Sequence, residues 1–302
     1  MTVCLSTNGV NVHRADAPPS RLLVATAGGL SILERDSAQW RHTQTVLHEM
    51  HPSALAFEPN GGGIFAGIHG GGLYFSDDDG ATWERRTNGL SVEHVFSVRA
   101  YTSGQTTTIL AGTEPVSLFK SIDYGQTWTE LPAIHGVPNM DKWTFPGPPH
   151  IAHTKSIAVD PRDPNVMFVG VEQGALLHTT DGGKSFTEIE SYYTPADKWY
   201  RDIHQVVLRP SNPDEIYMNT GIGFYHSPDQ GKTWEHRTDT ESRIGYPDQL
   251  VFSTLDDTVL FITGARRDPT TWRREGTADA MVWKSTDGGR TFASLAVVCR
   301  HR

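Results

Sequence analysis

The stretch Ser227-Pro228-Asp229-Gln230-Gly231-Lys232-Thr233-Trp234 decides the fold, because four other segments of the chain repeat its pattern. Each copy has Ser or Thr first, Asp third, Gly fifth, Thr or Ser seventh and an aromatic residue eighth. The other copies of this octapeptide are Ser76–Trp83, Ser121–Trp128, Thr179–Phe186 and Ser285–Phe292. A pattern kept five times at fixed offsets identifies a repeat protein.

The spacing of the octapeptides predicts the architecture. Successive copies begin 45, 58, 48 and 58 residues apart, which is the length of one four-stranded blade of a β-propeller with loop insertions in the longer intervals. We predict an all-β fold and a single β-propeller domain over residues 1–302, with six visible blades of four antiparallel strands. The chain stops a few residues after Phe292, so a seventh blade missing at the C-terminus stays an alternative.

Local chemistry explains why the octapeptide would be kept. Asp229 can accept hydrogen bonds from the backbone of its own turn, Gly231 allows a positive φ, and Trp234 can pack between neighbouring blades. We therefore interpret these Asp residues as structural and give them no catalytic role.

The octapeptide resembles the Asp box, or BNR repeat, of the sialidase-like and bacterial glycosyl-hydrolase-like β-propellers. This resemblance covers nearly the whole chain and implies the fold rather than the function, because Asp-box propellers include hydrolases, receptors and a photosystem II assembly factor. Sialidases bind a carboxylate through three arginines, and the spacing of Arg201, Arg243, Arg266 and Arg267 does not reproduce that pattern. No sialidase catalytic residue is carried over.

Composition narrows the classes of partner. A net charge of -9 and a pI near 5.8 argue against a nucleic-acid surface or an anionic membrane, since both select basic stripes. The first residues lack a basic segment followed by an apolar run, so we expect a cytoplasmic protein. Cys4 and Cys299 are expected to be free thiols, and the protein is expected to be a monomer.

The loops separate two faces of the predicted propeller. The loop entering the first strand of a blade and the loop between its second and third strands lie on one face, which we call the near face. All three long insertions fall there: 132–149, 190–202 and 265–280. Since loops on a rigid scaffold carry binding sites, the near face is the predicted functional face. The first blade is predicted to have strands at Asn8–Ala15, Leu22–Thr26, Leu30–Glu34 and Trp40–Val46.

Polar, titratable residues gather at the near ends of the innermost strands. Aligning these strands places His51, His94 and His153 at one position, where the fifth and sixth blades have Asp202 and Tyr246. Two residues further along, on the same side of each strand, the fourth to sixth blades have Lys155, His204 and Asp248. The loops after the second strands add His69, Glu114, Glu172, Arg266 and Arg267.

Three interpretations of this cluster stay open. Imidazoles beside carboxylates suit a divalent transition metal such as zinc, with His51, His94, His153 and His204 as candidate ligands. Alternatively, Glu114, Glu172, Asp202 and Asp248 are candidate catalytic acids or bases. The third interpretation is that the channel residues only hydrogen-bond trapped water.

Aromatic and cationic residues complete the predicted site. The candidate ligand-binding residues are Trp143, Trp199, Tyr246, Lys155, Arg266 and Arg267. Aromatic rings beside polar groups suit sugars, although the same rings could instead hold long loops against the sheets. The leading hypothesis is binding of a small polar ligand or carbohydrate such as a glycoside, with its hydrolysis as an option. The alternative is a non-enzymatic binding or assembly scaffold with a protein partner.

Overall fold

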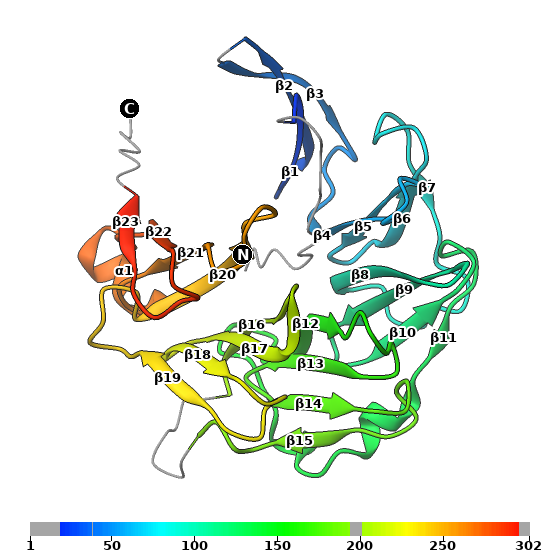
Figure 1. Ribbon diagram of the computed structural model, residues 1–302. Helices are drawn as coiled ribbons and strands as arrows, with labels where there is room; N and C mark the ends of the chain where they lie inside the picture. Colours follow the sequence, from blue (N-terminus) through cyan, green and yellow to red (C-terminus); the bar gives the residue numbers. More distant parts are fainter. Residues whose placement is uncertain (1–18, 38, 194–200, 296–302) are drawn as a thin grey trace. The chain divides into compact units, whose positions relative to one another are not determined.

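The computed structural model describes residues 19–37, 39–193 and 201–295. Within these residues the strands form six antiparallel sheets, five with four strands and one with three. The strands of each four-stranded sheet lie in chain order, as in β8–β9–β10–β11 (Figure 1). The prediction of an all-β, six-bladed β-propeller is confirmed.

The strand bounds follow the sequence pattern closely. The first three sheets contain β1 (Arg21–Thr26), β2 (Gly29–Asp36) and β3 (Gln39–Val46); β4 (Pro52–Phe57), β5 (Ile64–Ile68), β6 (Gly72–Ser76) and β7 (Glu84–Arg85); and β8 (Val95–Ser103), β9 (Thr106–Thr113), β10 (Leu118–Ser121) and β11 (Thr129–Glu130). Three of the four strands predicted for the first blade are thus confirmed, and the fourth, Asn8–Ala15, lies outside the described residues.

The other three sheets contain β12 (His153–Val159), β13 (Met167–Glu172), β14 (Leu176–Thr179) and β15 (Thr187–Ile189); β16 (Ile203–Arg209), β17 (Asn212–Thr220), β18 (Gly223–Ser227) and β19 (Glu235–Thr238); and β20 (Tyr246–Phe252), β21 (Leu260–Ala265), β22 (Met281–Ser285) and β23 (Ala293–Leu295). Two 3₁₀-helices, η1 (Pro132–Gly136) and η2 (Met140–Lys142), lie in the first long insertion, and α1 (Pro269–Glu275) lies in the last. No helix in the described parts of the chain is long and apolar enough to cross a bilayer.

The chain divides into two compact units, each with its own buried apolar cluster. Unit 1 comprises residues 1–138, 144–157 and 183–186, and unit 2 comprises residues 139–143, 158–182 and 187–302. Phe65 and Phe119 are fully buried in unit 1, as are Phe168 and Phe224 in unit 2. Every residue of β5 is buried, as expected for a strand covered on both faces of its sheet.

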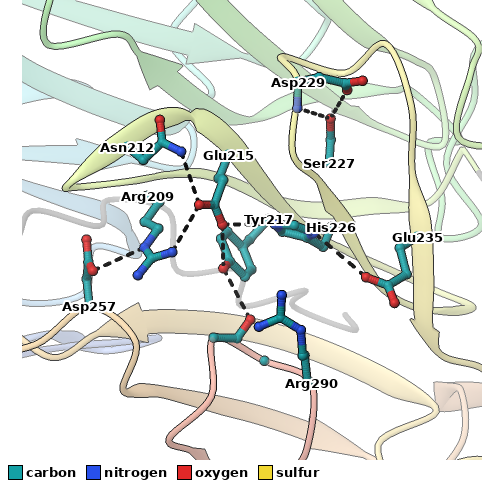
Figure 2. A network of polar contacts seen from close by, with 12 residues as sticks. Arg209, Asn212, Glu215, Tyr217, His226, Ser227, Asp229, Glu235, Asp257 and Arg290 are labelled. Carbon is teal, nitrogen blue, oxygen red and sulfur yellow. Dashed lines mark hydrogen bonds and ion pairs between the residues drawn. The ribbon is translucent and has the colours of Figure 1, made fainter.

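Each octapeptide folds into a turn in which the hydroxyl of its first residue donates to the carboxylate of its Asp. The Ser227 hydroxyl donates to Asp229 Oδ1 (3.0 Å) and accepts from the Gly231 N–H (2.8 Å), as Figure 2 shows for the Ser227–Asp229 contact. Asp229 also accepts from the backbone N–H (2.8 Å) and the hydroxyl (2.7 Å) of Thr233. Gly231 has a φ of 83°. The predicted bonding of this turn is confirmed, and Asp78, Asp123 and Asp287 repeat it.

The first octapeptide offers a matched test of this turn. Hydrogen bonds from the side chain and backbone of Thr82, then from Ser76, lower the pKa of Asp78 from 3.8 to about 2. Asp78→Ala is expected to lower the melting temperature at pH 7, whereas the adjacent, exposed Asp77→Ala leaves it nearly unchanged. Because a depressed carboxyl pKa stabilises above the unfolded value, the difference should shrink below pH 3.8 and vanish near pH 2. Thermal melts at several pH values measure both; equal melting temperatures for the two variants at pH 7 would contradict the prediction.

A network of polar contacts joins the fifth and sixth sheets within unit 2 (Figure 2). Its centre is Glu215 on β17, whose side chain is 18% exposed. Four neighbours donate hydrogen bonds to its carboxylate: Arg209 (3.0 Å), Asn212 (3.1 Å), Tyr217 (3.3 Å) and His226 (3.1 Å). Arg209 also donates to Asp257 (3.1 Å) in the β20–β21 connection, and the Tyr217 hydroxyl lies 3.2 Å from the Gly288 carbonyl oxygen. The network therefore ties the two sheets together through Arg209 and Tyr217, both of which the Glu215 carboxylate holds in place.

Candidate functional site

The near ends of three sheets place predicted site residues together in unit 2. Glu172 is the last residue of β13, Asp202 directly precedes β16, His204 is the second residue of β16, and Tyr246 begins β20. In an antiparallel blade, the start of the first strand and the end of the second strand lie at the same edge. The predicted alignment of strand ends therefore brings these four side chains into one neighbourhood.

The two carboxylates and the imidazole form a compact, buried group. Glu172 and Asp202 face each other across an isolated antiparallel β-bridge. One potential ligand atom from each of Glu172, Asp202 and His204 lies within 4.8 Å of the other two. Glu172 is 3% and His204 1% exposed, while the Asp202 side chain is 13% exposed and opens the group toward solvent. Across the described parts of the chain, this is the one such group of three His, Cys, Asp or Glu residues.

A backbone carbonyl fixes the orientation of the His204 ring. The Nδ1 atom lies 2.6 Å from the carbonyl oxygen of Pro247, which can only accept a hydrogen bond. Nδ1 therefore carries a proton and donates it, and Nε2 is the atom 3.4 Å from Asp202 Oδ2. The Tyr246 ring covers the imidazole with a centroid distance of 4.6 Å.

An aromatic and cationic rim borders this group. The Tyr246 ring lies 6.2 Å from that of Trp272 on α1, and Trp272 Nε1 donates to the Arg267 carbonyl (2.9 Å). Beside it is a polar cleft of about 290 Å³ lined by Arg266, Arg267, Thr271, Glu275, Thr277, Ala278 and Asp279. Arg267 pairs with Glu275 at 3.3 Å, whereas Arg266 has no ion pair among the residues that the structure describes.

The sequence predicts only a loop insertion over residues 265–280. The structure has the helix α1 within it, and this helix supplies Trp272. Its signals are nevertheless present. The Asp268 side chain accepts from the Thr270 N–H (3.0 Å) as an N-cap, Pro269 occupies the first turn, and Gly276 ends the helix with a φ of 71°. An Asp-Pro pair followed seven residues later by Gly could have predicted α1 and placed Trp272 beside the site.

Unit 1 holds a second cluster, made of four histidines at the corresponding strand ends. His69, which follows β5, lies between His51 (ring centroids 5.6 Å apart) and His94 (4.7 Å). The fully buried ring of His153 stacks on Phe96 at 3.9 Å, and its Nδ1 lies 3.6 Å from Glu114 Oε2. The predicted metal candidates thus separate: His51, His94 and His153 belong to unit 1, and His204 belongs to unit 2.

The pKa of His69 should make unit 1 sensitive to mild acid. Burial first, and then the neighbouring His94, lower it below the ordinary value of 6.5, while Glu114 acts in the opposite direction. Because the pKa of His69 is lower in the folded protein, the unfolded protein binds a proton more readily. The free energy of unfolding should therefore fall as the pH drops below the ordinary value of 6.5. We expect His69→Phe to flatten the loss of stability between pH 7 and 5 in urea titrations. The exposed control His42→Phe should keep the wild-type slope, and an unchanged slope for His69→Phe would contradict this prediction.

The aromatic residues of the long loops are differently placed from Tyr246. Trp143, after η2, is 8% exposed, and its ring lies against Gly174 in the β13–β14 turn. Such packing holds the loop against the sheet, so its role in ligand binding stays a prediction. Trp199 lies outside the described residues.

The remaining candidates are spread over both units. Lys155 on β12 is 3% exposed, and Glu114 is 8% exposed at the end of β9. Asp248 on β20 is half-buried, and its backbone carbonyl accepts from Asn219 Nδ2 at 3.0 Å. Their predicted catalytic or binding roles stay predictions.

Comparison with known proteins identifies one curated relative and several solved structures with a similar fold. The chain matches no protein-family model. A probable oligoxyloglucan-reducing end-specific xyloglucanase of Neosartorya fischeri is 24% identical over 227 residues, which are 68% of this chain and 26% of that protein. This chain therefore spans well under two thirds of that curated relative.

Solved structures agree on the architecture. An ancestral GH74 enzyme matches with a TM-score of 0.64 and 18% identity, over 82% of this chain and 31% of that one. The GH74 xyloglucanase from Xanthomonas campestris has a TM-score of 0.59 and 17% identity, over 90% and 44%. YCF48 bound to a D1 peptide has a TM-score of 0.59 and 14% identity, over 92% and 78%. The protein is a six-bladed β-propeller similar to those of GH74 xyloglucanases and of YCF48.

Proposed function

We propose that this protein binds a carbohydrate, a small glycoside-like ligand, at the near-face rim of unit 2. The observation that carries the proposal is the partly exposed Tyr246–Trp272 ring pair, which stands between a buried polar group and a polar cleft. Sugars bind where aromatic faces cover their C–H groups and nearby polar groups take their hydroxyls. The similarity to xyloglucanases supports this class of ligand. We also infer that the five octapeptides are Asp boxes.

We propose binding rather than hydrolysis as the function. Glu172 and His204 are almost fully buried, so they lie beneath the rim, and only Asp202 among the three has an appreciably exposed side chain. Turnover of chromogenic glycosides that is abolished by Asp202→Asn would overturn this choice and make Asp202 a catalytic carboxylate.

Calorimetric titration with xyloglucan oligosaccharides tests the binding. Removing a stacking ring costs about 1.4 kcal/mol, or about tenfold in affinity, so Trp272→Ala and Tyr246→Ala should each weaken binding by about that factor. Trp40→Ala provides the control, since Trp40 is 38% exposed on β3 of unit 1 and far from the site in sequence. Affinity that is unchanged in both rim variants, or lost equally in the control, would contradict the proposed site.

A second candidate function, an assembly scaffold that binds a peptide segment, is favoured by one observation. This chain spans 78% of YCF48, whose structure holds a D1 peptide, but only 26% of the xyloglucanase relative. Failure of all oligosaccharides to bind, together with retention of an extended peptide on the immobilised protein, would favour the scaffold. Trp272→Ala would then show whether the peptide uses the same rim.

A further inference from the structure

We propose that Glu172, Asp202 and His204 bind one divalent transition-metal ion, of which zinc is the representative. The proposal stands on the geometry of these residues in unit 2 and does not rest on carbohydrate binding. It replaces the all-histidine ligand set expected from strand alignment with one imidazole nitrogen and two carboxylate oxygens.

The distances suit a shared ion. Zinc binds imidazole nitrogen and carboxylate oxygen at about 2.1 Å, so two ligands in a tetrahedral arrangement stand about 3.4 Å apart and no two can exceed about 4.2 Å. His204 Nε2 and Asp202 Oδ2 are 3.4 Å apart. The atoms of the whole group lie within 4.8 Å of one another, close to that limit. Main-chain pairing of Glu172 with Asp202 holds both carboxylates at the site before any ion arrives.

The orientation of His204 is the second argument. Its Nδ1 donates to the Pro247 carbonyl, and a ligating histidine commonly uses its other nitrogen in this way, which fixes the tautomer and the ring plane. In the neutral ring, Nε2 then presents a lone pair to a carboxylate oxygen at 3.4 Å. The nitrogen that would bind the ion therefore lies beside one of the two proposed carboxylate ligands.

The backbone next to Asp202 is shaped to keep room for its carboxylate. The Gly221 N–H donates to the Asp202 carbonyl (2.8 Å), and a Cβ at Gly221 would lie only 2.3 Å from Asp202 Oδ2. A side chain at position 221 would therefore displace a ligand oxygen. Gly221→Ala is accordingly a variant that perturbs the site without removing any of its donors.

The donor set selects the class of metal. Magnesium and calcium prefer sites made only of oxygen, while a nitrogen with two carboxylate oxygens suits zinc, manganese or iron. The histidines of unit 1 provide the contrast. There His153 Nδ1 lies 3.6 Å from Glu114, but His51, His94 and Glu114 form no group of three ligand atoms that meets the same distance limit within the described chain. Glu114 is therefore the matched control carboxylate.

The experiment uses the full chain, freed of any purification tag and stripped with EDTA. Calorimetric titration with zinc chloride, and metal analysis after gel filtration, are expected to give one zinc per chain. Asp202→Asn, Glu172→Gln and His204→Gln should each weaken zinc binding by at least about 100-fold, since loss even of supporting contacts costs 10- to 100-fold. Gly221→Ala should weaken it as well. Glu114→Gln should bind zinc like the wild type, and circular dichroism verifies that each variant is folded.

A readout on the wild type alone keeps the test decisive if a variant does not fold. Zinc should raise the melting temperature of the unaltered protein, and EDTA should reverse the rise. No zinc uptake by the wild type, full zinc binding by Asp202→Asn, or selective binding of magnesium or calcium would each overturn the proposal. No sugar is present in these measurements, so failure of carbohydrate binding and failure of metal binding are distinguished. Because a bound ion would occupy both carboxylates, zinc binding would also exclude their use as the acid and base of a glycosidase.

Discussion

Replacing Glu215 by alanine is expected to lower the free energy of unfolding by about 3 kcal/mol. The carboxylate is the common acceptor for Arg209, Asn212, Tyr217 and His226, and its loss leaves donors on three strands without their partner (Figure 2). Burial alone would raise the pKa of Glu215, but the bonds from His226, Asn212 and Arg209 outweigh it and lower the pKa. The stabilisation is therefore present above the unfolded pKa of 4.5 and is lost as the pH falls below it.

Glu235 supplies the control for this prediction because it also lies near His226 and pairs with Arg237 (2.9 Å), but its side chain is 62% exposed. The Arg237 side chain is only 3% exposed, but it keeps its hydrogen bond to the Gly288 carbonyl when Glu235 is removed. Since the carboxylate that is lost is itself exposed, Glu235→Ala should cost about 1 kcal/mol or less. Urea unfolding of both variants at pH 7 measures the difference. Equal losses would show that Glu215 acts as an ordinary surface carboxylate and that the network does not hold the two sheets together.

Substituting Gly223 with alanine should destabilise the protein by about 3 kcal/mol or more. Gly223 begins β18 with a φ of 138°, a conformation that side chains rarely adopt, and an added Cβ would lie 1.8 Å from the Thr238 carbonyl oxygen on β19. Relief requires β18 and β19 to separate. The Thr238 hydroxyl, which accepts from the Phe224 N–H (3.1 Å), would lose its position as well.

Gly276→Ala separates the cost of the overlap from the cost of a positive φ. Gly276 has a φ of 71°, but an added Cβ would meet nothing within 4 Å. We expect it to cost about 1 kcal/mol, because only the backbone conformation is unfavourable. Denaturant titrations of the two variants give the comparison, and a Gly223→Ala variant no less stable than Gly276→Ala would refute the steric argument.

Local pattern explains how much of the fold the sequence could predict. An octapeptide turn is determined by contacts within four residues, so each copy is visible without knowledge of the rest of the chain, and the strands follow from its spacing. The helix α1 has equally local signals at Asp268 and Gly276, and it was missed because the interval was interpreted as an insertion.

The site was only partly predictable, because strand ends can be aligned from sequence but side-chain directions cannot. The alignment correctly assigned Glu172, Asp202, His204 and Tyr246 to the same edge of their sheets. It could not show that His204 joins two carboxylates while His51 and His94 contact His69 instead. The Pro247 carbonyl that orients His204 belongs to the backbone of another strand. Since every residue has a backbone carbonyl, the sequence cannot indicate which one contacts the imidazole.

The local hydrogen bonds of the octapeptide turns have a consequence for how such a repeat protein can evolve. In the turn at Ser227, the Ser227 hydroxyl and the Asp229 carboxylate bond to groups within four residues, so these contacts form with the hairpin itself, and Ser191 adds a hydrogen bond to the Gly231 carbonyl. A duplicated or recombined blade would therefore include the turn that joins its last two strands. Insertions such as 265–280 can then lengthen, shorten or be exchanged at the opposite edge, which leaves specificity free to diversify while the scaffold is inherited.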